Sequence, residues 1–438
     1  MNSNRNIFAA LVLLLIFCLT AACNKQEQKF IRVEDGMFLR GDKPYYFIGT
    51  NYWYGAVLGS PGEYGDRERL VRELDHLKSI GVNNLRILAG AEGPDGEPSR
   101  VTPALQAAPG VYNKDLLDGL DFLLSEMNKR GQLAILYLNN SWEWSGGFAQ
   151  YLSWNGYGPV PYPLLPQYSW PQFMEYTSQF HECDGCLEQF HDHIRFMLGR
   201  TNKYTGIKYT DDPAIMTWEI ANEPRAFSKE MLPAFTDMIA NTAGLIKELD
   251  KNHLVTTGSE GQHGCEGSME AFEKIHSDPA IDYLTMHIWP KNWGWLDIKN
   301  TGEKIEQSIS NTNKYMDDHI NIARKLNKPI VLEEFGLPRD SHRFDPSSSV
   351  TMRDRYFTNC FERVLEHACN KGVLSGCNFW AYAGEGRASQ DSLYWKPGDD
   401  YLGDPPQEEQ GLNSVFNTDP TIFLIDKYNN LITKCLQE

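Results

Sequence analysis

Two glutamates at the ends of apolar segments have the surroundings of reactive groups. Glu223 stands in "TWEIANEPR" (residues 217–225), and Glu334 stands in "PIVLEEFG" (residues 329–336). A carboxylate at the end of a buried strand is costly unless a partner or a reaction uses it. Two such carboxylates about 5 Å apart can cleave a glycosidic bond with retention, one as acid/base and one as nucleophile. Metal binding and structural ion pairs are the alternatives.

The segments that must position these glutamates recur along the chain. Eight short runs are rich in β-branched or aromatic residues and end in Gly, Pro or Asn, as strands do. They span residues 45–55, 83–90, 132–140, 215–224, 253–261, 283–290, 329–336 and 377–384. Amphipathic helical patterns lie between them, for example at residues 66–81 and 114–131, the second closed by Gly131 as a C-cap.

Strands that alternate with helices predict an α/β fold, here a single (β/α)8 TIM barrel with enlarged loops at the C-terminal face of the strands. A doubly wound open sheet is the alternative, but no Gly-rich phosphate turn follows the first strand. In a closed barrel the strand ends open into one mouth, so Glu223 and Glu334 can face each other. Because side chains alternate along a strand, Glu333 and Glu334 should point to opposite faces, with only one in the mouth.

The loop after the third strand is the longest and is crowded with aromatic residues between positions 142 and 170. Flat rings beside a cleft suit the apolar face of a sugar. Trp142 and Trp144 are candidates for such contacts, together with Trp53 at the end of the first strand. The alternative is that the aromatic residues of this loop pack on one another.

The longer motifs resemble glycoside hydrolase family 5. "WEIANEP" followed by "LEEFG" is similar to the family, while "GRTNKYTGIKYTDDPAIMTWEIANEPR" and "LNNSWEWSGGFAQYLSW" are similar to its β-mannanase subfamily (subfamily 7). The resemblance runs from about Gly49 to Gly386. It implies a retaining hydrolase of β-1,4-mannosidic bonds that uses no cofactor and no metal.

The resemblance also implies roles for individual residues. Glu223 would be the acid/base, Glu334 the nucleophile, and Asn222 would bind the 2-hydroxyl of the attacked sugar. Arg86 would hold the nucleophile ionised through a charge-assisted hydrogen bond, unless it is a core arginine paired with Glu219. Further substrate contacts would come from His287, Trp289 and Trp380, for which plain structural roles are the alternative.

One position departs from the family pattern. Two residues after His287 the family has a Tyr that donates to the nucleophile, and this chain has Trp289. An indole N–H donates one hydrogen bond but cannot accept one, and the ring is larger. With Trp293 and Trp295 it could narrow the cleft, which favours release of single sugars from chain ends.

Four functions follow in order. Endo-β-1,4-mannanase comes first, then an exo-acting β-mannosidase on manno-oligosaccharides, and then a β-1,4-glucanase. A surface lipoprotein that captures glycans without cutting them is the last, because capture needs neither both glutamates nor Asn222 and Arg86 beside them.

The first residues have the pattern of a targeting signal. An apolar run at residues 7–19 is too short to span a bilayer, and small residues lead from it to Cys23. This resembles a bacterial lipoprotein signal whose cysteine is acylated after cleavage, although Thr20 stands where Leu is usual. We expect residues 1–22 to be removed and residues 23–438 to form the barrel, anchored to the outer membrane at its periplasmic or cell-surface face. Secretion without an anchor is the alternative.

Seven further cysteines follow, an odd number, so at least one is free or pairs between chains. Cys183 and Cys186 are close enough for a local disulfide in an oxidising compartment. Zinc held with the nearby histidines 181, 191 and 193 is an alternative, but no second cysteine pair completes the ligand set. Calcium binding or a solvated rim are the interpretations of Asp399, Asp400, Asp404, Glu408 and Glu409.

The formal net charge of −17 repels nucleic acid and anionic lipid and suits a neutral substrate. The remaining composition, with 41% hydrophobic residues and no second membrane-length segment, is that of a soluble globular protein. We expect a monomer that touches the membrane only through Cys23 and whose partner is a β-mannan or manno-oligosaccharide.

Overall fold

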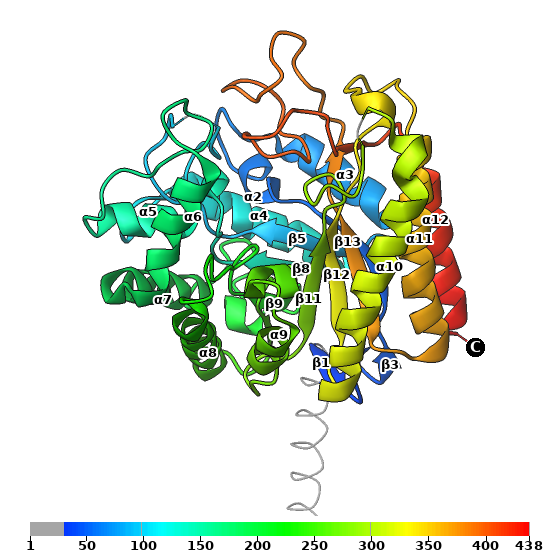
Figure 1. Ribbon diagram of the computed structural model, residues 1–438, viewed down its shortest axis with the longest axis horizontal. Helices are drawn as coiled ribbons and strands as arrows, with labels where there is room; N and C mark the ends of the chain where they lie inside the picture. The colour runs from blue at the N-terminus through cyan, green and yellow to red at the C-terminus, as the bar shows by residue number, and fades with distance from the viewer. Residues whose placement is uncertain (1–29, 98, 298, 438) are drawn as a thin grey trace, which may run out of the picture.

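Eight parallel strands form the centre of the molecule (Figure 1). This computed structural model describes residues 30–97, 99–297 and 299–437, so the expected signal and Cys23 lie outside the described residues. The strands are β4 (Phe47–Asn51), β5 (Asn84–Leu88), β8 (Leu133–Tyr137), β9 (Ile215–Glu219), β10 (Leu254–Thr256), β11 (Leu284–Ile288), β12 (Ile330–Phe335) and β13 (Leu374–Phe379). Seven of the eight runs predicted as strands contain one of them, and the eighth, residues 377–384, begins inside β13 and continues to the end of β14 (Tyr382–Gly384).

The strands are neighbours in the order β10-β9-β8-β5-β4-β13-β12-β11, which bends round into a nearly closed barrel. Side chains bridge the remaining seam between β10 and β11. The hydroxyl of Thr256 donates to the carbonyl of Tyr283 across 2.9 Å, and that of Thr285 donates to the carbonyl of Ser259 across 2.8 Å. The predicted (β/α)8 barrel is confirmed, and the open-sheet alternative is wrong.

A helix that covers the outside of the barrel follows each strand. These helices are α3 (Arg67–Ser79), α4 (Lys114–Arg130), α7 (Asp184–Leu198), α8 (Leu232–Leu249), α9 (Met269–His276), α10 (Thr301–Leu326), α11 (Thr351–Asn370) and α12 (Thr421–Cys435). Local sequence sets their ends. The Asp66 carboxylate accepts from Arg69 N at 2.9 Å to start α3, and Gly131, with φ of +69°, ends α4 as predicted.

A small antiparallel sheet closes the end of the barrel opposite the mouth (Figure 1). It consists of β1 (Ile31–Glu34), β2 (Met37–Arg40) and β3 (Lys43–Pro44). Phe38 is fully buried and meets Tyr283 at a centroid distance of 5.1 Å, within a cluster that includes Phe47 and Val331 near the starts of barrel strands. The sheet therefore seals the barrel floor.

The long connections at the other end carry the short elements. These are α2 (Gly55–Leu58), β6 (Gln106–Ala108), β7 (Val111–Tyr112), η1 (Glu143–Ser145), α5 (Gly147–Trp154), α6 (Trp170–Ser178), η2 (Gln179–Glu182), η4 (Gln262–Cys265), η5 (Asp340–His342), β14 (Tyr382–Gly384) and β15 (Val415–Phe416). At the floor end, η3 (Tyr209–Asp211) lies in the connection between α7 and β9. The connections after β8 and β13 are long, and both reach the mouth (Figure 1).

Asp404 organises the connection between β14 and β15. It is buried, and its carboxylate accepts from Gly411 N at 2.9 Å, from Asn413 N at 2.8 Å and from the Ser414 hydroxyl at 2.6 Å. Asp399 and Asp400 likewise accept from backbone N–H groups. Neither calcium binding nor a solvated rim describes Asp404, because backbone donors already use its oxygens.

Two disulfides are present among the residues that the structure describes. Cys183 and Cys186 are bonded, with an S–S distance of 2.05 Å, in place of the zinc alternative. A second disulfide, which the sequence did not predict, joins Cys369 at the end of α11 to Cys435 at the end of α12. The described part of the chain also holds three free cysteines, all buried: Cys265, Cys360 and Cys377. Among the helices of this part, none is both long and apolar enough to cross a membrane.

Candidate active site

A cavity of about 490 Å³ opens at the C-terminal ends of the barrel strands. The predicted site residues that line it are Trp142, Trp144, Asn222, Glu223, Trp289, Glu334 and Trp380. Arg86 and His287 are fully buried and touch the two glutamates. The barrel thus brings together all but one of the residues that the sequence analysis selected.

Trp53 is the exception. Its indole is buried, donates to the Gly403 carbonyl at 2.9 Å and packs edge-on against Trp144 with 5.9 Å between the rings. Trp53 does not line the cavity, whereas Trp144, against which it packs, does, so a contact between Trp53 and substrate stays a prediction. The aromatic loop is divided in the same way: Phe148 stacks on Phe180 at 4.2 Å in the core, while Trp142 and Trp144 reach the cavity.

Glu223 is held just beyond β9 by its neighbours on both sides. Asn222 N donates to Asn139 O at 2.8 Å in the connection after β8, and Glu223 N donates to Gly258 O at 3.0 Å after β10. Glu223 has a φ of +48°, a left-handed conformation that is strained for a residue with a side chain. The backbone on both sides fixes this conformation and aims the carboxylate into the mouth.

A β-bulge places Glu334 at the mouth. Met286 of β11 pairs with Leu332, whereas the next residue, His287, pairs with Glu334, so Glu333 is the extra residue on β12. The expected alternation therefore fails. Glu333 does not face away but lies inside the barrel, with its carboxylate 3.8 Å from both the Arg86 and His287 side chains. Of these two glutamates, only Glu334 lines the cavity.

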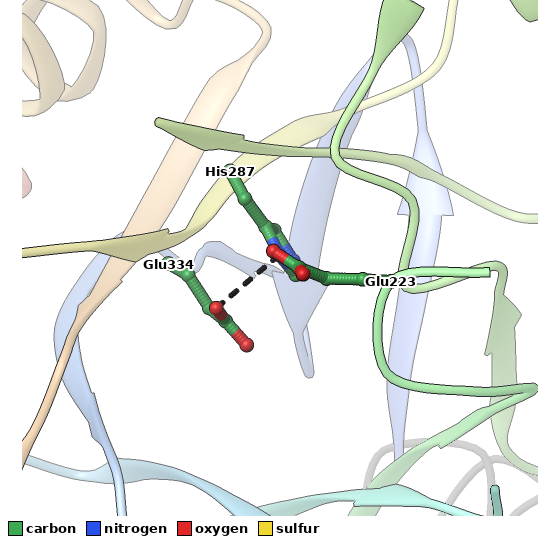
Figure 2. A group of neighbouring side chains, drawn as sticks. All are labelled: Glu223, His287 and Glu334. Carbon is green, nitrogen blue, oxygen red and sulfur yellow. Dashed lines mark hydrogen bonds and ion pairs between the residues drawn. The ribbon is translucent and has the colours of Figure 1, made fainter. Parts of the chain in front are cut away.

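The two candidate glutamates meet at His287 (Figure 2). One carboxylate oxygen of each and a ring nitrogen of His287 lie within 4.8 Å of one another. His287 Nδ1 is 2.9 Å from Glu223 Oε1 and 3.4 Å from Glu334 Oε2. This separation is that of carboxyl pairs in retaining glycosidases, about 5 Å, and is shorter than the 6.5 Å or more of inverting ones.

Arg86 connects the nucleophile candidate to the barrel interior. Its Nη1 donates to Glu334 Oε1, its Nε donates to Glu219 at 2.9 Å, and its Nη2 donates to Asn222 Oδ1 at 2.8 Å. The guanidinium also lies 4.5 Å from the centre of the Tyr137 ring. Both interpretations of Arg86 hold together: it pairs with Glu219 in the core and with Glu334 at the site.

Two indoles complete the hydrogen bonds of the glutamates. Trp142 Nε1 donates to Glu223 Oε2, and Trp289 Nε1 donates to Glu334 Oε2 at 3.3 Å. Trp289 thus makes the donor contact that the sequence analysis expected of a Tyr at this position. Each glutamate has a donor from the cavity wall and a charged or ionisable partner behind it.

The protonation of the three groups is linked. Burial raises the pKa of Glu334 to about 7, against the charges of His287 and Arg86 that lower it. Burial acts in the same way on Glu223, but the hydrogen bond and charge of His287 outweigh it and lower the pKa of Glu223. Burial would lower the pKa of His287, yet the carboxylates of Glu334 and Glu223 raise it to about 10.

These directions favour a protonated His287, whose Nδ1 is hydrogen-bonded to Glu223. A retaining hydrolase needs the acid/base protonated and the nucleophile ionised. The hydrogen-bond donors distinguish the nucleophile from the acid/base. The guanidinium of Arg86, which is always charged, contacts Glu334 directly and favours its ionised form, as a nucleophile requires. Glu223 faces the group that carries a transferable proton.

Sequence reasoning missed several residues of the cavity wall. Arg225 follows the Asn-Glu-Pro triplet and pairs with Glu260, with Nη2 and Oε1 2.7 Å apart. Glu260 ends the fifth predicted strand, so the strand-end rule could have found it. Gln407 and Glu408 reach the cavity from the connection between β14 and β15, where no strand end signals them. Burial, with the nearby charges of Asp404 and Glu334, raises the pKa of Glu408 to about 8.

Comparisons with known proteins agree with this geometry. Residues 28–437 match the family described as "GH family 5 beta-mannosidase-like". Putative mannan endo-1,4-beta-mannosidase 9 of Oryza sativa subsp. japonica is 30% identical over 388 residues, which cover 85% of this chain and 86% of that protein. Mannan endo-1,4-beta-mannosidase 7 of Arabidopsis thaliana is 30% identical over 365 residues, covering 80% and 77%.

Solved structures give the same result. A glycoside hydrolase family 5 mannosidase from Rhizomucor miehei, in complex with mannosyl-fructose, superposes with a TM-score of 0.87 at 33% identity and covers 94% of this chain and 99% of its own. An endo-1,4-beta-mannanase from the same organism shares the fold, with a TM-score of 0.66 at 22% identity and coverage of 93% and 100%.

Proposed function

This chain belongs to glycoside hydrolase family 5, and from that premise we propose that it hydrolyses β-1,4-mannosidic bonds in mannans with retention of configuration, as a member of the β-mannanase subfamily. The observation that carries the proposal is the approach of Glu223 and Glu334 to within 4.8 Å at the mouth of the barrel. Cleavage within the polysaccharide chain is the first candidate, because relatives that align over most of this chain are named mannan endo-1,4-beta-mannosidases.

In this mechanism Glu334 attacks the anomeric carbon of the bound mannose and forms a covalent glycosyl-enzyme. Glu223 gives a proton to the departing glycosidic oxygen as the carbon–oxygen bond breaks. Glu223 then takes a proton from water, whose oxygen attacks the same carbon and releases Glu334. Two inversions leave the configuration unchanged.

The neighbours of the two glutamates support these steps. Arg86 and Trp289 donate to Glu334 and keep its attacking form ionised and aimed. His287 supplies the proton to Glu223 along their 2.9 Å hydrogen bond as negative charge develops on the departing oxygen. Asn222, whose Oδ1 is fixed by Arg86, is the contact for the 2-hydroxyl of the sugar. Trp142, Trp144 and Trp380 provide apolar faces for the sugar ring.

Azide rescue tests both assignments with an aryl β-mannoside that has a good leaving group. In Glu334→Ala, azide replaces the nucleophile and should give α-mannosyl azide. In Glu223→Ala, azide attacks the glycosyl-enzyme and should give β-mannosyl azide. Glu408→Ala changes another carboxylate of the same cavity and should give neither product. Exchanged configurations, or azide products from the Glu408 variant alone, would overturn the roles.

Release of single mannose units from chain ends is a second candidate. Trp289, Trp293, Gln407 and Glu408 all line the cavity, whose 490 Å³ is the size of a site for one short ligand. The Rhizomucor miehei mannosidase also has a higher TM-score than the endo-mannanase from the same organism.

Products released over time from linear mannan, galactomannan and short manno-oligosaccharides separate the two candidates. Mannose alone at the earliest times excludes internal cleavage, and a ladder of oligosaccharides excludes exo action. Faster hydrolysis of a β-1,4-glucan would contradict the choice of mannan. Binding of every β-mannan without hydrolysis would instead favour glycan capture.

We also propose that the protein is a monomeric lipoprotein anchored through Cys23. The sequence pattern before Cys23 supports export, and two disulfides fit an oxidising compartment outside the cytosol. In a bacterial host, Cys23→Ala should move the protein from the membrane fraction to the soluble fraction. Mass spectrometry of the N-terminal peptide should find acyl chains on Cys23, and an unmodified cysteine would refute the anchor. Light scattering would measure the molar mass in solution, which should be that of one chain.

A further inference from the structure

An apolar patch lies at the rim of the cavity, on the connection that follows β8. Leu164 and Trp170 are 45% and 41% exposed, and both line the cavity together with Met174. Large apolar side chains that are grouped and exposed beside a ligand cavity often form part of a binding surface, whereas single exposed ones are common anywhere. Neither the proposed mechanism nor the resemblance assigns a role to these three residues.

The indole of Trp170 is held in a fixed orientation. Trp170 is the first residue of α6, whose next residue is Pro171. Its ring lies 5.8 Å from Trp142 at an interplanar angle of 85° and 6.0 Å from Phe173 at 87°. A ligand that covers the exposed part of the indole does not have to order a mobile side chain, so little of its binding energy is lost.

Trp142 relates this patch to the chemistry. The same Trp142 that packs against Trp170 donates its Nε1–H to Glu223 Oε2. Glu223 is the group that protonates the departing oxygen in the proposed function, so the departing part of the substrate lies on the Glu223 side of the bond. Trp170 extends this side of the cavity outward.

The charges next to Trp142 are already paired. Arg225 lies 5.0 Å from the centre of the Trp142 ring, and its guanidinium is bound to Glu260. Contacts on this rim therefore come from apolar surface. This suits the C–H face of a pyranose ring better than it suits a charged ligand.

We propose that Trp170, with Leu164 and Met174 beside it, is a stacking platform for a sugar unit on the leaving-group side of the cleaved bond. The platform makes the enzyme select substrates by the length of the departing chain. This inference rests on the proposed function, because it needs Glu223 as the acid. The chemical class of the ligand is a neutral β-linked oligosaccharide with an exposed apolar ring face.

The test compares Trp170→Ala with the wild type on mannobiose, mannotriose, mannotetraose and an aryl β-mannoside. We take a sugar face to cover about half of the roughly 100 Å² of exposed indole. Losing this contact in Trp170→Ala should lower kcat/KM about tenfold. We expect this loss, mainly as a higher KM, on the longest substrate, and no loss on the aryl β-mannoside. Trp170→Phe should keep most of the activity on mannotetraose.

Tyr157→Ala is the matched control, because Tyr157 lies on the same connection, is 44% exposed and does not line the cavity. It should leave every substrate unaffected. Equal losses on all substrates in Trp170→Ala would mean that Trp170 only supports Trp142, and unchanged kinetics would mean that no sugar stacks there. Either result overturns the platform. A wild type that hydrolyses no manno-oligosaccharide would overturn the proposed function itself.

Discussion

Replacing Trp289 with Phe removes the indole N–H that donates to Glu334 Oε2 across 3.3 Å and leaves an aromatic ring in the cavity wall. A hydrogen bond to an ionised group is worth about 1.5–3 kcal/mol, and the length of this contact favours the lower value. About 1.5 kcal/mol corresponds to about one pKa unit. Burial already raises the pKa of Glu334 to about 7, so the variant should titrate about one unit higher.

The assay is kcat/KM for an aryl β-mannoside as a function of pH. Glu334 must be ionised to attack, so the acidic limb of the profile reports its pKa in the free enzyme. The limb should move up by about one pH unit in Trp289→Phe and return most of the way in Trp289→Tyr, which restores a donor.

Trp293→Phe provides the control, since Trp293 lines the same cavity and packs against Trp295 and Tyr315 rather than bonding to Glu334. Its acidic limb should stay in place. An unmoved limb in Trp289→Phe, or an equal movement in Trp293→Phe, would refute the reasoning that the indole stabilises the ionised nucleophile.

Two further predictions concern stability. Burial raises the pKa of Glu143 to about 7, and its carboxylate oxygens have no hydrogen-bond partner among the described residues. A raised pKa favours the fold below the unfolded value of about 4.5, and this contribution is lost as the pH rises through 7. The free energy of unfolding of Glu143→Gln, measured by urea denaturation, should therefore rise by about 3 kcal/mol relative to that of the wild type when the pH is raised from 5 to 8. An equal difference between the two proteins at both pH values would exclude this cause. Cys435→Ser should lose about 2–4 kcal/mol because its disulfide joins residues 66 apart, while Cys183→Ser, with a separation of 3, should lose less. Equal losses would count against the loop-length argument.

The sequence predicted those parts of the structure that depend on local pattern. The strands could be found because each is a short apolar run between turn residues, and the end of α4 could be found because Gly131 acts within one turn. Convergence of Glu223 and Glu334 followed from closure alone, since every strand of a parallel barrel ends at the same face.

Features that depend on pairing between distant segments could not be predicted. The position of Glu333 is set by a bulge, which exists only in the register between β11 and β12. Cys369 meets Cys435 because α11 and α12 pack side by side. Trp53 is an aromatic residue at the end of a strand, which made it a candidate for the cleft, but Trp144 from another connection packs against it. In each case the deciding neighbour is remote in sequence.

The sealed floor of the barrel has a consequence for access to polysaccharide. The chain enters at this pole, where β1 and Phe38 pack under the strands, while the catalytic mouth occupies the opposite pole (Figure 1). Because β1 is the first described strand, the proposed anchor ahead of it would join the molecule at its closed pole, and the opening at the other pole would stay accessible to a polymer far larger than the enzyme.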